Sequence, residues 1–393
     1  MKSQNYNKNL IVKGLPHSQQ IAINLYFDAA PKYESKKQSG YAHFLEHMLL
    51  EGSETHTDSM EISNKIDSLG GYLNAYTYPE FTVLEISVYY EEVKEAFSLL
   101  SELAYKPIFD KKGIEKEKKK IILEISRFED NLDNLSYALL RQKIAAPSSL
   151  SVGVSNLGTR ESVKSVDRES LIEFHQKFYN KEQARLSIAG NISKLNDSDI
   201  KKVIDKSYKK TKSTAYELKP GKGYTHKVKE ANSTYLKFAF WSKQDLKDYH
   251  MQLLHAQYLS LKMEEVFRNQ RGSAYVASAY LSEILDKDYI EVQLEVDHKE
   301  INYSVEKVKE IITDKKVDKE LFKSAKGRMV HKYLLDKPMD IADHNGLMMV
   351  RNLLKQPPQK FINFARNVSL KELEEFNIKF LSKLESNWVC ISV

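Results

Sequence analysis

The chain has 393 residues, of which 41% are hydrophobic, 29% charged and 10% aromatic. This length exceeds what one ordinary hydrophobic core needs, so we expect two domains of about 150–200 residues each. The net charge of +6 comes from lysines interleaved with acids, even in the densest cluster at 111–120. That pattern favours a solvated helix surface over a nucleic-acid interface, and we expect no nucleic-acid partner.

Targeting and redox signals are weak. The sequence contains no run of about 18 apolar residues, as a membrane-spanning helix needs, and residues 1–10 lack the apolar core of a signal peptide. The single cysteine, Cys390, excludes an internal disulfide and lies in an apolar C-terminal segment typical of a buried strand. We therefore expect a cytoplasmic protein without a membrane partner.

Strand and helix patterns alternate along the first half of the chain. Residues 19–30 and 81–90 show the alternation and β-branched content of strands, and residues 184–192 form a further apolar strand pattern. Residues 91–105 and 115–144 have the periodicity of helices. This alternation predicts a domain of mixed helix and sheet.

The second half begins after a polar, lysine-rich stretch. Residues 206–230 contain Pro220 and two glycines, which is typical of a linker. A strand pattern follows at 233–241, and a long helix is predicted from about Asp248 to Arg271. The order strand then helix thus repeats that of the first half.

A repeat supports this division. Residues 171–190 resemble residues 373–393, and both segments read as a helix followed by a strand. The two copies lie about half the chain apart. We predict an α+β protein of two similar domains, with a first domain at 1–205, a linker at 206–230 and a second domain at 231–393.

The segment YAHFLEHMLL, residues 41–50, places two histidines and a glutamate in an otherwise apolar helix. His43 and His47 are one turn apart and about 40° apart around the axis, and Glu46 shares their face. Two imidazoles at this spacing can bind one tetrahedral metal ion, while the glutamate can take a proton from a water molecule there. The H-x-x-E-H pattern predicts a metal site; the alternative is a chance pair of surface histidines.

A third ligand must come from another part of the chain. Glu117 and Glu124 are about two helical turns apart, so they share one face of the helix predicted at 115–144. Glu124 lies among isoleucines and a leucine, where an unpaired carboxylate would cost free energy. The residues alone leave open whether Glu124 is a ligand, an exposed acid or a partner of Lys120.

Taken together, these motifs resemble the pitrilysin family of zinc peptidases, which includes insulin-degrading enzyme and the mitochondrial processing peptidases. After H-x-x-E-H at 43–47, a glutamate follows with 76 residues between. The resemblance extends to LGGYLNAYTYPEFTVLEISV at 69–88, to GIEKEKKKIILEI at 113–125 and to residues 156–192. It implies the short, two-domain form of the family's fold, each domain being a mostly antiparallel sheet packed with helices.

The resemblance also implies the roles of the polar residues. His43, His47 and Glu124 would bind one Zn²⁺ per chain, in a catalytic domain formed by the first half. Glu46 would be the general base. Glu117 would orient one of the ligands through its carboxylate. Another divalent metal stays open.

Residues 72–80, YLNAYTYPE, read as a strand that ends at Pro79. An ordinary sheet edge would explain the pattern equally well. The resemblance implies that an extended substrate peptide pairs with this strand, with Asn74 and Ala75 as its contacts.

Residues 263–281 hold a second pair of interest. Arg268 precedes Tyr275, and Gly272 between them is predicted to be a left-handed helix C-cap. A capping arginine and a core tyrosine are the plain interpretation. The resemblance implies instead that Tyr275 stabilises the oxyanion of the reaction and that Arg268 holds a substrate carbonyl.

The sequence thus predicts a zinc-dependent endopeptidase for peptides or unfolded segments. A peptidase dedicated to one precursor or leader peptide, working with a partner subunit, is the alternative, and a non-catalytic family member is a third. Full-length relatives enclose a closed chamber with four such domains. A two-domain chain therefore predicts a homodimer in which Arg268 and Tyr275 of one copy complete the zinc site of the other. A heterodimer with a second family member stays open.

Overall fold

The structure is a computed structural model. It describes residues 4–6, 8–144, 156–205, 207–209, 211, 224–225, 233–241, 248–284, 287–351, 357–384 and 388–392. Within these ranges, no helix combines the length and hydropathy required to cross a bilayer. The predicted linker at 206–230 lies almost entirely outside the described residues.

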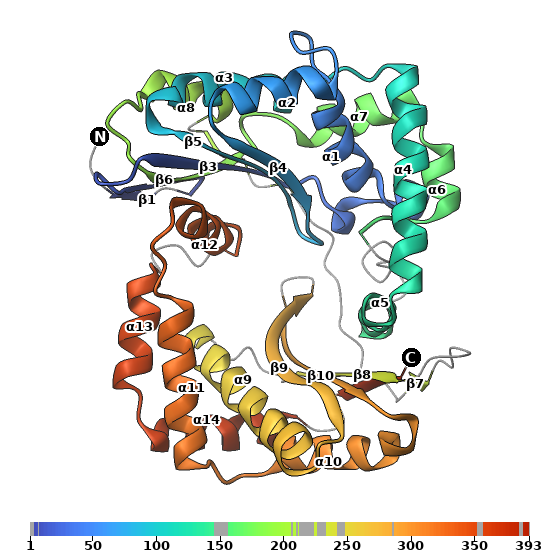
Figure 1. Ribbon diagram of the computed structural model, residues 1–393, viewed down its shortest axis with the longest axis vertical. Helices are drawn as coiled ribbons and strands as arrows, with labels where there is room; N and C mark the ends of the chain where they lie inside the picture. The colour runs from blue at the N-terminus through green and yellow to red at the C-terminus, as the bar shows by residue number, and fades with distance from the viewer. Residues whose placement is uncertain are drawn as a thin grey trace. The chain divides into compact units, whose positions relative to one another are not determined.

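Two compact units divide the chain, and each combines segments that are distant in sequence (Figure 1). The first unit comprises Met1–Ser126, Ser155–Ala215 and Leu335–Pro357, and the second comprises Arg127–Val154, Tyr216–Leu334 and Pro358–Val393. Each unit therefore contains one segment from the other half of the sequence. The domain ranges expected from the sequence, 1–205 and 231–393, do not include this exchange.

A mostly antiparallel sheet forms the centre of the first unit, with the strand order β1-β2-β6-β3-β5-β4 and one parallel pair, β2 with β6. Its strands are β1 Gln4–Tyr6, β2 Leu10–Gly14, β3 Gln20–Phe27, β4 Tyr72–Thr77, β5 Thr82–Tyr89 and β6 Arg185–Gly190. The strands predicted at 19–30, 72–80, 81–90 and 184–192 are confirmed. β4 lies at the edge of this sheet, so one side of its backbone has no neighbouring strand among the described residues.

Helices cover one face of this sheet and bury its aliphatic side chains. They are α1 Tyr41–Glu51, α2 Ser59–Ser68, α3 Val93–Tyr105, α4 Lys111–Asp130, α6 Arg160–Ser165, α7 Arg168–Phe178 and α8 Asp197–Val203. Phe27, Phe44 and Phe97 are fully buried in this core. Short 3₁₀ turns occur at Pro31–Tyr33, Lys36–Gln38 and Tyr90–Glu92.

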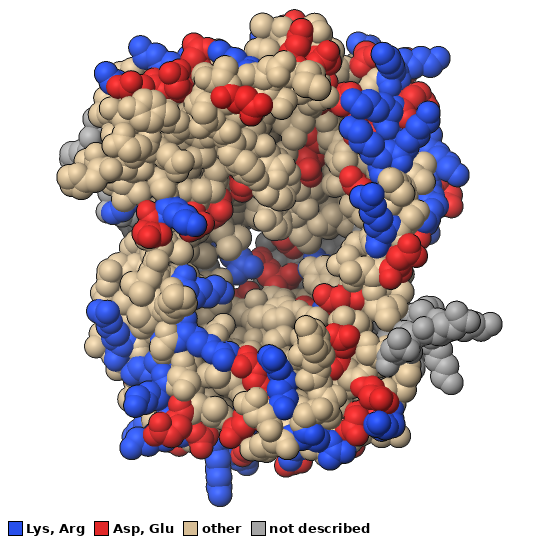
Figure 2. All heavy atoms as spheres, in the orientation of Figure 1, with Lys and Arg blue, Asp and Glu red and all other residues tan. Residues whose placement is uncertain are grey.

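The helix predicted at 115–144 is two helices, α4 and α5 (Leu132–Ile144). The break falls at Asn131, whose side-chain oxygen accepts a hydrogen bond of 3.0 Å from the backbone N–H of Asn134. An asparagine in this position satisfies a free amide at the start of a helix, so it begins α5 and ends α4. Figure 2 shows Lys and Arg side chains gathered over α4, where Lys118 pairs with Glu115 at 2.8 Å.

The second unit repeats this architecture. Its sheet has the order β7-β11-β8-β10-β9, so β11-β8-β10-β9 repeats the arrangement β6-β3-β5-β4. The strands are β7 Tyr224–Thr225, β8 Thr234–Phe240, β9 Ala274–Ile284, β10 Lys287–Val296 and β11 Trp388–Ser392. The helices are α9 Tyr249–Met263, a π-helical extension at Glu264–Gln270, a 3₁₀ turn at His298–Glu300, α10 Ile301–Thr313, α11 Lys319–Lys332, α13 Pro358–Asn367 and α14 Leu370–Lys383. Because α14 and β11 match α7 and β6 in order and place, the predicted repeat of two similar α+β domains is confirmed.

The exchanged segments are two helices that cover the remaining sheet faces. In the first unit, α12 (Pro338–Val350) packs on β6, β3 and β2 (Figure 1). Ser187 donates a hydrogen bond of 2.7 Å to the Ala342 carbonyl. Gly346 lies so close to Tyr26 that an added Cβ atom would come within 2.1 Å of the phenol oxygen. In the second unit, α5 packs on β8 and β11.

Candidate metal centre

The first turn of α1 is fixed by two features. Gly40 precedes it with φ of 88°, and a Cβ atom there would come within 2.5 Å of the Leu157 carbonyl oxygen, so only glycine fits. The buried Glu34 carboxylate accepts hydrogen bonds from the N–H groups of Gly40 and Ala42 at 2.8 and 2.7 Å. These bonds satisfy amides that have no partner within the helix. The orientation of the following residue, His43, is thereby set from outside α1.

Two imidazoles and one carboxylate meet between α1 and α4. Glu124 Oε2 lies 3.7 Å from His43 Nε2 and 3.6 Å from His47 Nε2. One ligand atom from each of the three residues lies within 4.8 Å of the others, and no second group of this kind occurs within the described ranges. The structure thus brings together the three side chains that the sequence singled out as ligands.

This donor set fits a zinc ion. Catalytic zinc takes three protein ligands from imidazole and carboxylate groups and keeps its fourth position open. Bonds of about 2.0–2.1 Å in a tetrahedron require ligand atoms about 3.3 Å apart, so the two distances from Glu124 Oε2 need to shorten by only a few tenths of an ångström. Two of the three distances between ligand atoms are therefore already close to those that a tetrahedral zinc ion requires.

The ring of His47 is held by Glu117. Glu117 Oε2 lies 2.8 Å from His47 Nδ1, which leaves Nε2 directed at Glu124. Burial opposes the charge of Glu117, but the hydrogen bonds to His47 and Lys120 lower the pKa of its carboxyl to about 2. A carboxylate on the outer nitrogen fixes the tautomer and orientation of a ligating imidazole. The contact is the one expected for a residue that orients a ligand.

The two histidines differ in their protonation. Burial, followed by the neighbouring His47, lowers the pKa of His43 to about 3. Burial also acts against the charge of His47, but the hydrogen bond to Glu117 and the charges of nearby carboxylates raise its pKa above 6.5. His43 is therefore a neutral imidazole ready for a metal, whereas His47 must lose a proton near neutral pH.

Glu46 projects from the same helix towards β4. Thr77 Oγ1 donates a hydrogen bond of 2.5 Å to Glu46 Oε2. Burial raises the pKa of Glu46 to about 7, although the Thr77 hydrogen bond acts in the opposite direction. Thr77 was missed by the sequence analysis; its only signal is its place at the end of the strand that begins at Tyr72.

Asn74 and Ala75 lie on the edge strand as predicted. The Ala75 N–H donates to Asn74 Oδ1 at 2.9 Å, and Asn74 Nδ2 donates to the Tyr72 hydroxyl at 3.0 Å. The Asn74 side chain thus occupies a backbone amide that an added strand could otherwise use.

Arg268 and Tyr275 lie in the second unit, whereas the three ligand candidates lie in the first. Arg268 is exposed in the π-helical segment, and Gly272 has the predicted left-handed conformation with φ of 63°. Tyr275 is the second residue of the edge strand β9 and is 82% exposed. Its exposure excludes the plain interpretation of a core tyrosine.

Comparisons with known proteins agree with this geometry. The family profile described as "Insulinase (Peptidase family M16)" matches residues 10–151, and "Peptidase M16 inactive domain" matches residues 165–329. The chain belongs to peptidase family M16. The candidate ligands all fall within the segment matched by the first profile.

Relatives of this M16 chain carry names that fit a metal-dependent peptidase. An "Uncharacterized zinc protease" of Rickettsia felis is 27% identical over 98% of this chain and 97% of its own length. The mitochondrial-processing peptidase subunit beta of Bos taurus is 29% identical over 44% of this chain and 34% of its own. A solved structure described as peptidase M16 inactive domain from Pseudomonas fluorescens shares the fold, with a TM-score of 0.84 and 16% identity over 99% and 96% of the two chains.

Proposed function

We propose that this protein is a zinc-dependent endopeptidase that cleaves extended peptide chains. The observation that carries the proposal is the convergence of His43, His47 and Glu124, whose ligand atoms lie within 4.8 Å of one another. When bound there, zinc would polarise the scissile carbonyl and lower the pKa of a coordinated water molecule. Relatives described as zinc proteases support zinc as the metal of this site.

Glu46 is the proton carrier in this proposal. A carboxyl with a pKa of about 7 can take a proton and return it at neutral pH. The Thr77 hydrogen bond holds one of its oxygens and so fixes the orientation of the carboxyl group. After the carbonyl is attacked, Glu46 passes this proton to the leaving amine, so no covalent intermediate with the protein is needed.

The substrate is an extended peptide because the binding surface is a strand edge. A peptide that adds to β4 forms main-chain hydrogen bonds along it, which gives affinity for any extended sequence. Asn74 releases the Ala75 N–H when the peptide arrives and exchanges one hydrogen bond for another. Segments already paired inside a folded protein cannot make this exchange, so peptides and unfolded segments are the preferred substrates.

The test is Glu46→Gln, which keeps the size of the side chain and removes the base. Elemental analysis should show about one zinc per chain, while cleavage of a fluorogenic peptide falls about 10²–10⁴-fold. Glu54→Gln, at an exposed acid after α1, is the control and should keep the parental rate. A zinc-loaded Glu46→Gln variant that cleaves at the parental rate would remove Glu46 from this role.

We further propose that the active form is a homodimer in which Arg268 and Tyr275 of a second copy act at the zinc site. An oxyanion donor is effective where water is excluded, whereas Tyr275 is 82% exposed in the single chain. A second copy would both cover the phenol and bring it to the substrate.

Mixing inactive variants tests the shared site. Glu46→Gln and Tyr275→Phe chains each lack one part, so dimers of the two contain one complete site and should recover part of the activity after subunit exchange. A fully active monomer, or mixed dimers without recovery, would reject the homodimer. Activity that requires a different copurified chain would favour a heterodimer.

A further inference from the structure

Three tyrosines project into solvent along the edge strand of the first unit. Tyr72, Tyr76 and Tyr78 are 47%, 39% and 44% exposed, and we call them the tyrosine ladder. The hydroxyls of Tyr72 and Tyr76 lie 3.1 Å apart, and the rings of Tyr76 and Tyr78 have centroids 6.4 Å apart. Large aromatic side chains exposed in a row on one strand are unusual unless they contact a ligand.

The ladder lies on the sheet face opposite to the metal centre. Side chains alternate between the two faces of a strand. Leu73 and Ala75 pack with the core under α1, and Thr77 on the same face reaches Glu46. The even-numbered residues Tyr72 and Tyr76 therefore point to the other face. A peptide added to β4 would place every second side chain there.

A pair of carboxyl groups lies on the ladder side of the sheet. Glu85 is the cross-strand partner of Asn74, so it shares the face of the tyrosines. Burial and then Asp343 of α12, to which it is hydrogen-bonded, raise the pKa of Glu85 to about 8. Asn24 donates a hydrogen bond to Asp343 and holds it in place. A hydrogen bond between two carboxyl groups requires a proton on one of them, so the pair carries one negative charge when the other carboxyl is ionised.

Glu85 lies opposite Asn74, between Tyr72 and Tyr76 on the same face of the sheet, so the carboxyl pair and the ladder are close neighbours. Burial and then the charges of Glu85 and Asp343 raise the pKa of Tyr78, and Glu85 also contributes to the raised pKa of Tyr76 after its hydrogen bond to Tyr72 and its burial. A carboxylate attracts a cation through its charge, and the face of a neutral phenol ring beside it adds a cation–π attraction. No lysine or arginine among the described residues forms an ion pair with Glu85.

We propose that the tyrosine ladder and the Glu85–Asp343 pair form a subsite for the lysine or arginine side chains of a bound peptide. The inference rests on the proposed function, because it takes the substrate to be a strand added to β4. Cationic residues at positions facing the ladder should favour binding, and acidic residues there should disfavour it. The preference should recur at every second position of the peptide, since only alternate side chains reach this face.

A peptide series tests the subsite. In an alanine-rich quenched fluorogenic peptide, one residue is changed in turn to lysine, norleucine or glutamate. Lysine at ladder-facing positions should raise kcat/KM about 5- to 30-fold over norleucine, and glutamate should lower it. Norleucine has the length of lysine without its charge, so the ratio isolates the cation.

Two variants assign the effect to the named residues. The double variant Glu85→Gln/Asp343→Asn removes the charge of the carboxyl pair, and Tyr76→Leu removes a ring; each should bring the lysine-to-norleucine ratio towards one. Tyr89→Leu, which removes an exposed tyrosine at the far end of β5, should keep the parental ratio. Thermal unfolding of each variant shows whether it is folded, and Tyr76→Leu remains informative if the double variant does not fold.

Binding separates this inference from the proposed function. Anisotropy of labelled lysine and norleucine peptides on the Glu46→Gln protein reports the preference without any cleavage. If Glu46→Gln still cleaves but lysine is preferred at alternate positions, the role of Glu46 fails and the subsite stands. If the parental protein cleaves and binds both peptides equally, or if its preference survives both Glu85→Gln/Asp343→Asn and Tyr76→Leu, the subsite is wrong.

Discussion

The two units share one architecture, but within the described parts of the chain only the first brings possible metal ligands together. In chain order, α9 follows β8 as α1 follows β3, and each helix carries two histidines. On α1 these histidines face the acids of α4. On α9, His250 packs against Phe361 at 4.5 Å between ring centroids, and His255 packs against Phe380 at 5.1 Å. The same fold thus supports a ligand cluster in one unit and an aromatic core in the other, and the facing side chains decide which.

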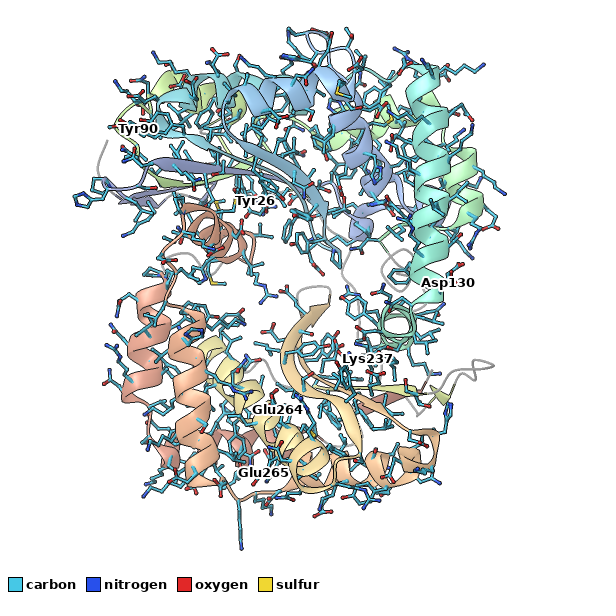
Figure 3. The ribbon with its side chains drawn as sticks, in the orientation of Figure 1. Tyr26, Tyr90, Asp130, Lys237, Glu264 and Glu265 are labelled. Carbon is cyan, nitrogen blue, oxygen red and sulfur yellow. The ribbon has the colours of Figure 1, made fainter. Side chains whose placement is uncertain are left out.

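The two exchanged helices, α5 and α12, differ in how much of their sheet face they cover. In the second unit, α5 closes over Lys237, which is only 2% exposed (Figure 3). Lys237 Nζ lies 2.9 Å from Asp133 of α5 and 3.4 Å from the fully buried Glu291. In the first unit, α12 leaves the tyrosines of β4 exposed. In the second unit, buried charged groups therefore contact the exchanged helix α5. In the first unit, the sheet face at β4 stays exposed beside α12.

The largest expected effect comes from removing a histidine from α1, with the removal of a histidine from α9 as the control. His47→Ala should abolish stoichiometric zinc binding, because two remaining ligands hold zinc weakly. His250→Ala on α9 should leave about one zinc per chain. Elemental analysis after dialysis measures both. Equal zinc content in the two variants would contradict the assignment of the site to the first unit.

Lys237→Met tests the charge network of the second unit. The change leaves Asp133 and the buried Glu291 without their cation, so we expect the free energy of unfolding to fall by about 3–5 kcal/mol. Lys307→Met, at a surface pair with Glu310, should cost at most about 1 kcal/mol. Urea unfolding measures both variants. A loss for Lys237→Met no larger than that of the control would show that the network does not stabilise the docked helix.

Glu117→Gln tests whether the carboxylate hydrogen-bonded to His47 strengthens zinc binding in the first unit. Loss of the carboxylate on His47 Nδ1 should weaken zinc binding about 10–100-fold. The neighbouring exposed Glu115, changed to Gln, is the matched control on the same helix. Competition with a chromogenic chelator gives the zinc Kd of each variant. Unchanged affinity in Glu117→Gln would make this contact a packing feature only.

The smallest effect is a pH dependence that distinguishes the two ligand histidines. Zinc requires neutral imidazole, and the pKa of His47 is raised above 6.5 while that of His43 is lowered to about 3. As the pH falls below the pKa of His47, zinc must displace its proton, and affinity should fall about tenfold per pH unit. Glu117→Gln, which replaces the charged hydrogen-bond partner that raises this pKa with a neutral amide, should move the onset to lower pH. A fall in affinity only near pH 3 would assign it to His43 instead.

Much of the centre could be predicted because it lies within single elements. His43, Glu46 and His47 share one helical segment, and a fixed rise and rotation per residue determine their geometry. Glu117 and Glu124 share a face of α4 for the same reason. The edge strand β4 and the repeated helix and strand at the ends of the two halves also follow from local periodicity. The resemblance to a known family then paired α1 with α4.

Contacts between distant segments were decided only by the tertiary structure. The local sequence of α5 and α12 does not show which sheet each helix covers, and both cover the sheet of the other half. Glu34 at the start of α1, Thr77 beside Glu46 and Asp343 beside Glu85 likewise depend on residues that only folding brings together. A sequence fixes the periodicity of each element directly, whereas the partner of a buried polar group is set by long-range packing, which no local pattern encodes.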